Sequence, residues 1–282
     1  MYTFASKMSP SLLTQWLQYQ EQHGRLTFSL AELREALPGM SAQALKTALY
    51  RSCINKRICP VWQGFYVILP PEYRPMGTVP PCEYIEKLMQ HLGKPYCVAL
   101  LNAAAYHGAA HQRPMNFTVM TAEPKPRYKV SPTSRIDFIT KREFANGIPP
   151  EFTTRIKTQF GSMLVTTPEF TALSLLQYTR LSGGLSHVLT VMEELADACR
   201  FDTLPDSALQ FIPLACFQRL GFMLHRLLGL PEHAVHLERL IQRSGRPMRK
   251  TPLDPLSPDA AGDYDPKWKI LVNSHPENNL DD

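Results

Sequence analysis

Five side chains that can donate hydrogen bonds lie between residues 43 and 51, at spacings that suit one side of a helix. They are Gln43, Lys46, Thr47, Tyr50 and Arg51. At about 100° per residue they share one face, and the opposite face carries Ala44, Leu45, Ala48, Leu49 and Ser52. Amide, hydroxyl, ammonium and guanidinium groups are those that proteins use on base edges and phosphates. The pattern predicts a helix with one buried side and one side suited to nucleic acid.

The charge around this polar face has a single sign. No Asp or Glu occurs between Ala36 and Pro71, a stretch that contains the cations Lys46, Arg51, Lys56 and Arg57. A local positive field suits a phosphate backbone. We expect the polar face, including Gln43, to contact a major groove of double-stranded DNA. The phosphates are expected to contact Lys56, Arg57 and Gln63.

The neighbouring residues must hold this face in place. Ser41 is expected to start the helix at Ala42, because its oxygen can accept hydrogen bonds from the first free amides. Asn55 is predicted to end the helix in a left-handed conformation. Short strands at residues 56–61 and 64–68 are then expected to form a hairpin around a tight turn.

The preceding residues complete the pattern of a winged helix-turn-helix. A first helix is predicted to start at Ser9 and Pro10, and a short strand is predicted at residues 25–28. Ser29 is predicted to cap a second helix over residues 30–37. Helix, strand, helix, turn, helix and two-stranded wing is the order of elements in winged-helix DNA-binding domains.

Prolines at positions 70, 71, 75, 80 and 81 mark a boundary, since proline lacks an amide donor and disfavours helix before it. We expect a winged helix-turn-helix domain at residues 1–75. A larger mixed α/β domain is expected at residues 76–282, with a partly irregular tail from about residue 245. Its strands precede a helical block, which is typical of a sheet covered by helices. The predicted fold class is α+β.

Composition excludes several classes of protein. The chain has 282 residues, 44% of them hydrophobic, and a formal net charge of +5, as an ordinary globular protein can have. No apolar run approaches the roughly 18 residues of a membrane span and no signal-peptide core is present, so we expect a cytoplasmic protein without a membrane partner. The six scattered cysteines are expected to be reduced. No P-loop or dinucleotide-binding motif occurs, so no cofactor is expected.

Two histidine pairs and one acid carry weaker signals of chemistry. His107 with His111, and His233 with His236, have spacings that can share a metal ion, but neither pair has a clear third ligand nearby. Asp137 lies in a predicted strand with a faint likeness to metal-dependent nuclease cores. We favour polar or core histidines and a plain strand with alternate exposed charges, so no catalytic or metal site is predicted.

Two further basic sets occur later in the chain. The first comprises Lys125, Arg127, Lys129, Arg135, Lys141 and Arg142. The second comprises Arg239, Arg243, Arg246, Arg249 and Lys250. Each set either extends a nucleic-acid footprint or forms a solvated face, and the second interpretation is favoured.

A series of different short motifs is spread over the chain between about residue 10 and about residue 245. They are Gly64-Phe65-Tyr66-Val67, Tyr96, Leu100-Leu101-Asn102-Ala103-Ala104-Ala105-Tyr106-His107-Gly108-Ala109, Gln112-Arg113-Pro114, Gly161-Ser162, Thr167-Pro168-Glu169-Phe170-Thr171-Ala172, Leu175-Leu176, Gly183-Gly184-Leu185 and Arg219-Leu220-Gly221-Phe222-Met223-Leu224. In this order they resemble the AbiEi-type antitoxins of type IV toxin-antitoxin (abortive infection) systems. The motifs are short, and their ordered series carries the resemblance.

The resemblance implies a winged-helix domain that binds and represses the promoter of its own operon, with an inverted-repeat operator. It implies a larger C-terminal domain required for protection against a nucleotidyltransferase-like toxin encoded alongside, without a stable complex between the two proteins. We expect a non-enzymatic protein. Two other classes stay open: an enzyme that processes nucleic acid and uses the winged helix for targeting, and a protein-interaction module.

Overall fold

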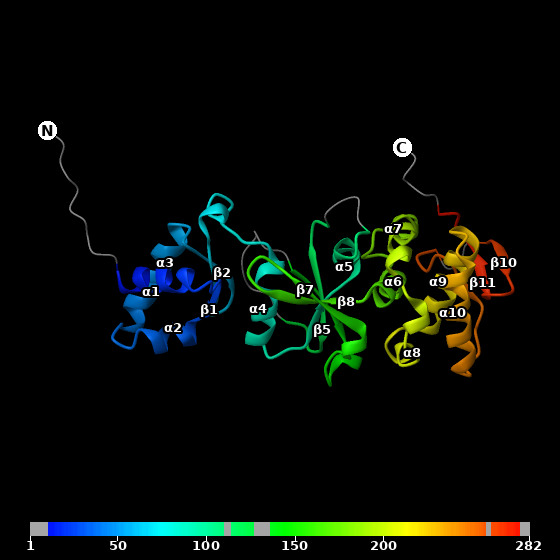
Figure 1. Cartoon of the computed structure of the whole chain (residues 1–282), viewed down its shortest axis with the longest axis horizontal. Helices are drawn as coiled ribbons and strands as arrows, with labels where there is room; N and C mark the ends of the chain where they lie inside the picture. The colour runs from blue at the N-terminus through cyan, green and yellow to red at the C-terminus, as the bar shows by residue number, and fades with distance from the viewer. Residues whose placement is uncertain (1–10, 110–113, 127–135, 258–260, 277–282) are drawn as a thin grey trace. The chain divides into compact units, whose positions relative to one another are not determined.

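A computed structural model describes residues 11–109, 114–126, 136–257 and 261–276 (Figure 1). Within these ranges helices and strands are interspersed, and the strands form three separate sheets. The α+β class is therefore confirmed. The chain divides into two compact units. One comprises Met1–Pro95, Pro126–Ile136 and Ile156–Met163, and the other comprises Tyr96–Lys125, Asp137–Arg155 and Leu164–Asp282.

The N-terminal elements follow the predicted order. They are α1 (Leu12–Gln22), β1 (Thr27–Ser29), α2 (Leu30–Ala36), α3 (Ala42–Ile54), β2 (Ile58–Trp62) and β3 (Phe65–Ile68). The three strands form an antiparallel sheet with β3 in the centre, in the order β1-β3-β2. Gly64 has a φ of 71° in the tight turn between β2 and β3, a conformation that glycine adopts without steric cost.

Serine side chains begin α2 and α3 as predicted. The Ser29 hydroxyl accepts a hydrogen bond from the amide of Glu32, whose carboxylate accepts one from the amide of Ser29. This reciprocal capping box satisfies two amides that a helix start leaves free. The Ser41 hydroxyl accepts a hydrogen bond from the amide of Ala44.

The start of α1 differs from the prediction. Ser9 and Pro10, where the sequence predicts this start, lie outside the described residues. The described helix begins at Leu12, because the Ser11 hydroxyl accepts a hydrogen bond from the amide of Thr14 and so acts as the N-cap.

The small sheet is buried on both faces. On one face Phe28, Ile58 and Ile68 share a core with Leu45 and Leu49 of α3. Neighbouring residues along a strand point to opposite faces, and the alternate positions are buried as well: Cys59, Val61, Phe65 and Val67. The face of the sheet that points away from α3 is therefore covered as well.

The proline-rich segment after β3 is ordered. It forms the short 3-10 helices η1 (Pro71–Tyr73) and η2 (Pro81–Glu83), followed by the helix α4 (Ile85–His91). The compact unit that contains β1, β2 and β3 includes this segment as far as Pro95. The functional boundary near residue 75 stays a prediction.

A five-stranded mixed sheet follows, in the order β6-β5-β4-β8-β7. The strands are β4 (Tyr96–Val98), β5 (Phe117–Ala122), β6 (Ile136–Lys141), β7 (Thr153–Lys157) and β8 (Ser162–Thr166). β4 pairs antiparallel with β5 and parallel with β8. The chain between β6 and β7 adds the short 3-10 helices η3 (Arg142–Phe144) and η4 (Pro150–Phe152).

Helices dominate the rest of this unit. They are α5 (Leu100–Tyr106), α6 (Pro168–Gln177), α7 (Leu185–Ala198), the 3-10 helix η5 (Phe201–Thr203), α8 (Ala208–Phe211), α9 (Leu214–Phe222) and α10 (Pro231–Arg243). α6 contacts α5, α7 and α9, and their apolar side chains share one core with Cys97, Met120 and Ile139 of the sheet. No helix in the described ranges is both long and apolar enough to cross a membrane.

The tail after α10 docks through Trp268. Thr251–Pro252 (β9), Asp263–Asp265 (β10) and Ile270–Val272 (β11) form a small sheet. Trp268 is 1% exposed, and its indole N–H donates to Nδ1 of His225 at 3.2 Å. His225 belongs to a π-helical turn, Met223–Leu227 (η6), which follows α9 directly.

Gly221 of α9 is a specific test of this docking. A Cβ atom at this position would overlap the ring of Trp268, so Gly221→Ala must displace the ring or the helix. We expect a loss of about 1–3 kcal/mol in the free energy of unfolding, measured by denaturant titration. Gly161→Ala is the control, because nothing lies near its added methyl group. Equal stability of the two variants would contradict the tight contact between Gly221 and Trp268.

Candidate nucleic-acid interface

α3 is a two-sided helix. Its buried residues are Leu45, Leu49 and Ser52. Its exposed residues include the predicted contacts Gln43, Lys46, Tyr50 and Arg51, with Tyr50 66% exposed. Ala44, predicted on the buried side, is exposed because it lies at the margin of the apolar arc. The polar side of α3 is thus open to a partner.

Thr47 is half-buried, and its hydroxyl is already engaged. The hydroxyl donates to the backbone carbonyl of Gln43 at 3.0 Å, one helical turn back. In this arrangement Thr47 offers a partner an acceptor oxygen and a methyl group. It does not offer the donor that the sequence analysis expected.

A groove of about 490 Å³ lies beside the polar side of α3. Gln43, Lys46 and Tyr50 line it from α3, and Tyr66 lines it from β3. Arg34 of α2 also lines it and adds a cation that the sequence analysis did not single out. Arg34 lies between Glu32 and Glu35, so the sequence around it is not basic. In the structure the Glu32 carboxylate accepts a hydrogen bond in the capping box.

Ile54 is a second exposed residue of α3 that the sequence pattern did not predict as a contact. It is 61% exposed and lies one helical turn after Tyr50. Apolar side chains on such a face can contact the methyl group of thymine. The sequence does show that an apolar isoleucine lies on the polar face of the predicted helix, four residues after Tyr50.

The end of α3 is set by Lys56. Asn55 has a φ of −78°, whereas Lys56 has a φ of 49°, so the predicted left-handed Asn55 is wrong by one residue. The reason is that Asn55 still serves as the C-cap of α3 and the chain reverses only after it. The Lys56 ammonium donates to the carbonyl of Pro75 at 3.1 Å, which orients this cation.

The hairpin after α3 has a fixed tip. The amide of Leu30 donates to the carbonyl of Gly64 at 2.7 Å, which holds the turn beside the start of α2. Gln63 is exposed at this turn and Arg57 is half-buried before β2. Neither residue lines the groove beside α3, so any contact they make with a partner is separate from it.

Two of the acidic residues near these elements are paired, whereas Glu35 of α2 belongs to no ion pair within the described ranges. Glu21 pairs with Arg74 and Glu32 pairs with Arg25, each at 3.3 Å. Neither Lys46 nor Arg51 belongs to an ion pair within the described ranges. The cations of α3 therefore keep their charge available for an external anion.

The histidine pairs do not form a metal site in the part of the chain that the structure describes. Nε2 of His107 lies 2.6 Å from the carbonyl oxygen of Thr166, and His111 lies outside the described residues. The ring of His233 packs edge-on against Phe201. No three His, Cys, Asp or Glu residues gather among the described ones.

The charged side chains of β6, Asp137 and Lys141, bond to other side chains of the protein. The Asp137 carboxylate accepts a hydrogen bond from Nδ2 of Asn116 at 2.7 Å. Lys141, expected as an exposed charge, is instead buried, and its ammonium donates to Oε1 of Gln177 at 2.7 Å. Burial lowers the pKa of Lys141 to about 8. The expectation of a solvated face is wrong for this lysine, because its strand position faces the core.

Some of the other members of the two basic sets are engaged within the chain. Arg142 pairs with Glu123 at 3.3 Å, and Arg243 pairs with Asp206 at 2.7 Å. Arg246 donates to the carbonyl of Leu209. Arg127, Lys129 and Arg135 lie outside the described residues. Lys125, Arg239 and Arg249 are exposed and belong to no ion pair within the described ranges, so each set also presents open cations.

All six cysteines are free. Burial raises the pKa of the Cys97 thiol to about 12 and of the Cys53 and Cys216 thiols to about 11. These thiols are therefore protonated at neutral pH and pack as small apolar groups.

Comparison with known families finds a match in the middle of the chain. Residues 96–226 match the family model of the AbiEi antitoxin C-terminal domain. This match supports an AbiEi-type antitoxin. The resemblance drawn from the motifs is confirmed, and the AbiEi domain supports a role as the antitoxin of a toxin-antitoxin pair. No curated protein matches the chain significantly.

A solved structure extends the likeness in fold to most of the chain. The crystal structure of the RV2827C protein from Mycobacterium tuberculosis superposes with a TM-score of 0.65 at 13% sequence identity. The match covers 95% of this chain and 93% of that one. At this identity the likeness concerns the fold alone.

Several motif residues of the AbiEi domain make hydrogen bonds or packing contacts within the domain. Oδ1 of the buried Asn102 accepts a hydrogen bond from the amide of Thr118 at 2.8 Å. The Thr171 hydroxyl donates to the carbonyl of Thr167 at 2.7 Å. Gly221 leaves room for Trp268. The motifs that identify the domain thus preserve its packing.

The backbone at Lys56 gives a test of the local geometry. Lys56→Gly should leave the free energy of unfolding unchanged or raise it by up to about 1 kcal/mol, because a left-handed φ strains any residue with a Cβ atom. Lys46→Gly removes the same charge from the interior of α3 and should lower that free energy by about 1 kcal/mol. Denaturant titration measures both. Equal destabilisation by the two substitutions would argue against a left-handed Lys56.

Proposed function

We propose that the chain is the antitoxin of a type IV toxin-antitoxin system and represses its own operon. In this proposal α1, β1, α2, α3, β2 and β3 form a winged helix-turn-helix that binds promoter DNA. The observation that carries the proposal is α3, a helix with a buried apolar side and an exposed, unpaired cationic side. An inverted-repeat operator is part of the proposal.

The chemistry of α3 supports contacts with a major groove. Lys46 and Arg51 supply donors for guanine edges or phosphates, and Gln43 supplies an amide suited to adenine. Tyr50 adds a hydroxyl and an exposed ring. Arg34 widens the positive surface on the groove side, while Lys56, Arg57 and Gln63 are assigned to backbone phosphates.

The AbiEi domain carries the antitoxic function in this proposal. It counteracts a nucleotidyltransferase-like toxin encoded alongside, without a stable complex and without catalysis of its own. The division of labour falls near residue 75, and the protein acts in the cytoplasm. The two functions then depend on different side chains.

Two other functions are less well supported. A nucleic-acid-processing enzyme would use Asp137, but this carboxylate is bonded to Asn116 and no metal-binding cluster forms among the described residues. A protein-interaction module would not account for the absence of acidic residues between Ala36 and Pro71.

Arg51 and Lys46 test the DNA contact directly. Arg51→Ala is expected to weaken binding to a promoter fragment by roughly 1–3 kcal/mol if the guanidinium contacts a base, and Lys46→Ala should weaken it as well. Fluorescence anisotropy with labelled promoter DNA measures the effect. Arg180→Ala, an exposed arginine in the other unit, serves as the control and should bind normally. Unchanged affinity of both α3 variants in folded protein would remove α3 from the interface.

Salt dependence tests the electrostatic part. If Lys46, Arg51, Lys56 and Arg57 make most of the backbone contacts, the logarithm of affinity should fall against the logarithm of salt with a slope of about −3 to −5 per bound protomer. Titrations at several salt concentrations give this slope. A flat response would contradict a phosphate-binding surface.

A further inference from the structure

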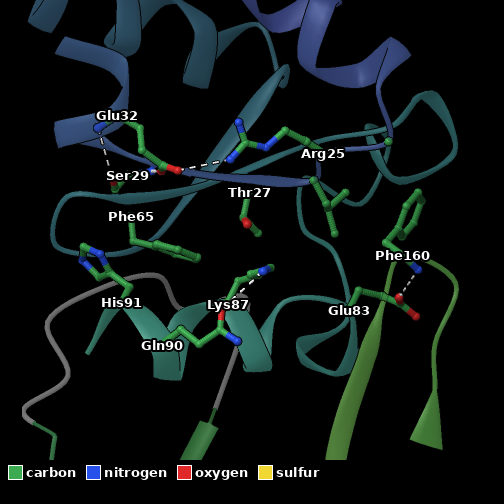
Figure 2. Close-up of a pocket in the computed structure, with 12 residues that line it drawn as sticks. Arg25, Thr27, Ser29, Glu32, Phe65, Glu83, Lys87, Gln90, His91 and Phe160 are labelled. Atoms are coloured by element: carbon green, nitrogen blue, oxygen red, sulfur yellow. Dashed lines mark hydrogen bonds and ion pairs between the residues drawn. The ribbon is translucent and has the colours of Figure 1, made fainter. Parts of the chain in front are cut away.

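A second cavity lies in the unit that contains the N-terminal elements. Its volume is about 490 Å³, within the range of small-molecule sites. Its walls come from β1, β3, α4 and the turn around Phe160, and it is distinct from the groove that α3 lines. Figure 2 shows Thr27 and Lys87 on opposite walls, with Phe65 and His91 at one end and Phe160 at the other.

The groups available in this cavity are mainly hydrogen-bond donors. The Lys87 ammonium has one hydrogen-bond partner, the amide oxygen of Gln90 at 3.2 Å in the same helix. The Thr27 hydroxyl makes no hydrogen bond within the described residues. His91 follows Lys87 by one helical turn, and its ring nitrogens have no hydrogen-bond partner there. These groups can accommodate an anion without breaking any bond that the fold needs.

The two carboxylates of the cavity are already occupied. Glu32 accepts from the amide of Ser29 at 2.6 Å and pairs with Arg25 at 3.3 Å. Glu83 accepts from the amide of Phe160 at 2.9 Å. The Arg25 side chain is 58% exposed, so its pairing with Glu32 is weak enough for the guanidinium to turn toward an anion. Both acids keep their charge and match the two cations of the lining, so an anion would be held at close range by the Lys87 ammonium and the Thr27 hydroxyl and not by a net positive charge of the cavity.

Aromatic rings add a second recognition element. The rings of Phe65 and His91 lie 5.1 Å apart at one end of the cavity, and the ring of Phe160 lies at the other (Figure 2). Flat heteroaromatic rings stack on such side chains irrespective of their hydrogen-bonding pattern. A ligand that satisfies both elements carries a phosphate and an aromatic base.

We propose that this cavity binds a nucleoside monophosphate, with the phosphate between Lys87, Thr27 and Arg25 and the base beside Phe65 and His91. The ligand would contact the wall that contains the capping box of Ser29 and Glu32, at the start of α2. A nucleotide would then be an effector of the repressor. That regulatory role rests on the proposed function, whereas the binding itself does not.

The test is isothermal titration calorimetry of the full-length protein with AMP, GMP, CMP and UMP. Inorganic phosphate and the corresponding nucleosides are the controls that lack one recognition element. At least one nucleotide should bind with one-to-one stoichiometry, at least tenfold more tightly than phosphate and nucleoside. Lys87→Gln should weaken this binding at least tenfold and Thr27→Val severalfold. Lys157→Gln, an exposed lysine that does not line the cavity, should have no effect.

Three results would overturn the proposal. They are absence of binding by all four nucleotides at millimolar concentration, an equal loss in Lys157→Gln and Lys87→Gln, and loss of nucleotide binding in Arg51→Ala. The last result would place the nucleotide on α3 instead. Because no DNA is present in the titration, failure of the DNA-binding proposal leaves the outcome unaffected.

Discussion

The burial of one side of α3 is the constraint on which the candidate interface depends. Leu45 and Leu49 pack into a core with Phe28, Ile58 and Ile68, so the helix can neither rotate nor shift without exposing apolar surface. The opposite side must then face outward. A rigid helix with a fixed exposed face is what specific contact with a nucleic acid requires, because side chains on rigid elements reach their partners with little loss of entropy.

The same constraint extends through the sheet. Because β2 and β3 are buried on both faces, the sheet that supports α3 depends on cover from outside the six N-terminal elements as well as from α3 itself. The ordered segment as far as Pro95 belongs to the same compact unit. A functional division near residue 75 and a structural unit that reaches Pro95 are compatible, since contact with DNA and support of the sheet are separate tasks.

Local signals in the sequence predicted much of this fold, and longer-range packing decided the rest. The caps at Ser29 and Ser41, the helix α3 and the hairpin of β2 and β3 follow from capping and periodicity, which act within one or two turns. Tertiary contacts set the features that were missed. Trp268 donates a hydrogen bond to His225 of the π-helical turn. Lys141 is buried because its position in the strand faces the core. Arg34 lines the groove because α2 and α3 pack together. No pattern of neighbouring residues encodes these contacts.

The most direct test measures both functions in the same cells. Full-length protein carrying Lys46→Ala and Arg51→Ala is expressed beside the toxin encoded with it and beside a reporter driven by its own promoter. The reporter should become derepressed while protection against the toxin is retained, because the AbiEi domain is intact. Retained repression would contradict the assignment of α3 to DNA. Loss of protection in a folded variant would contradict the separation of the two functions.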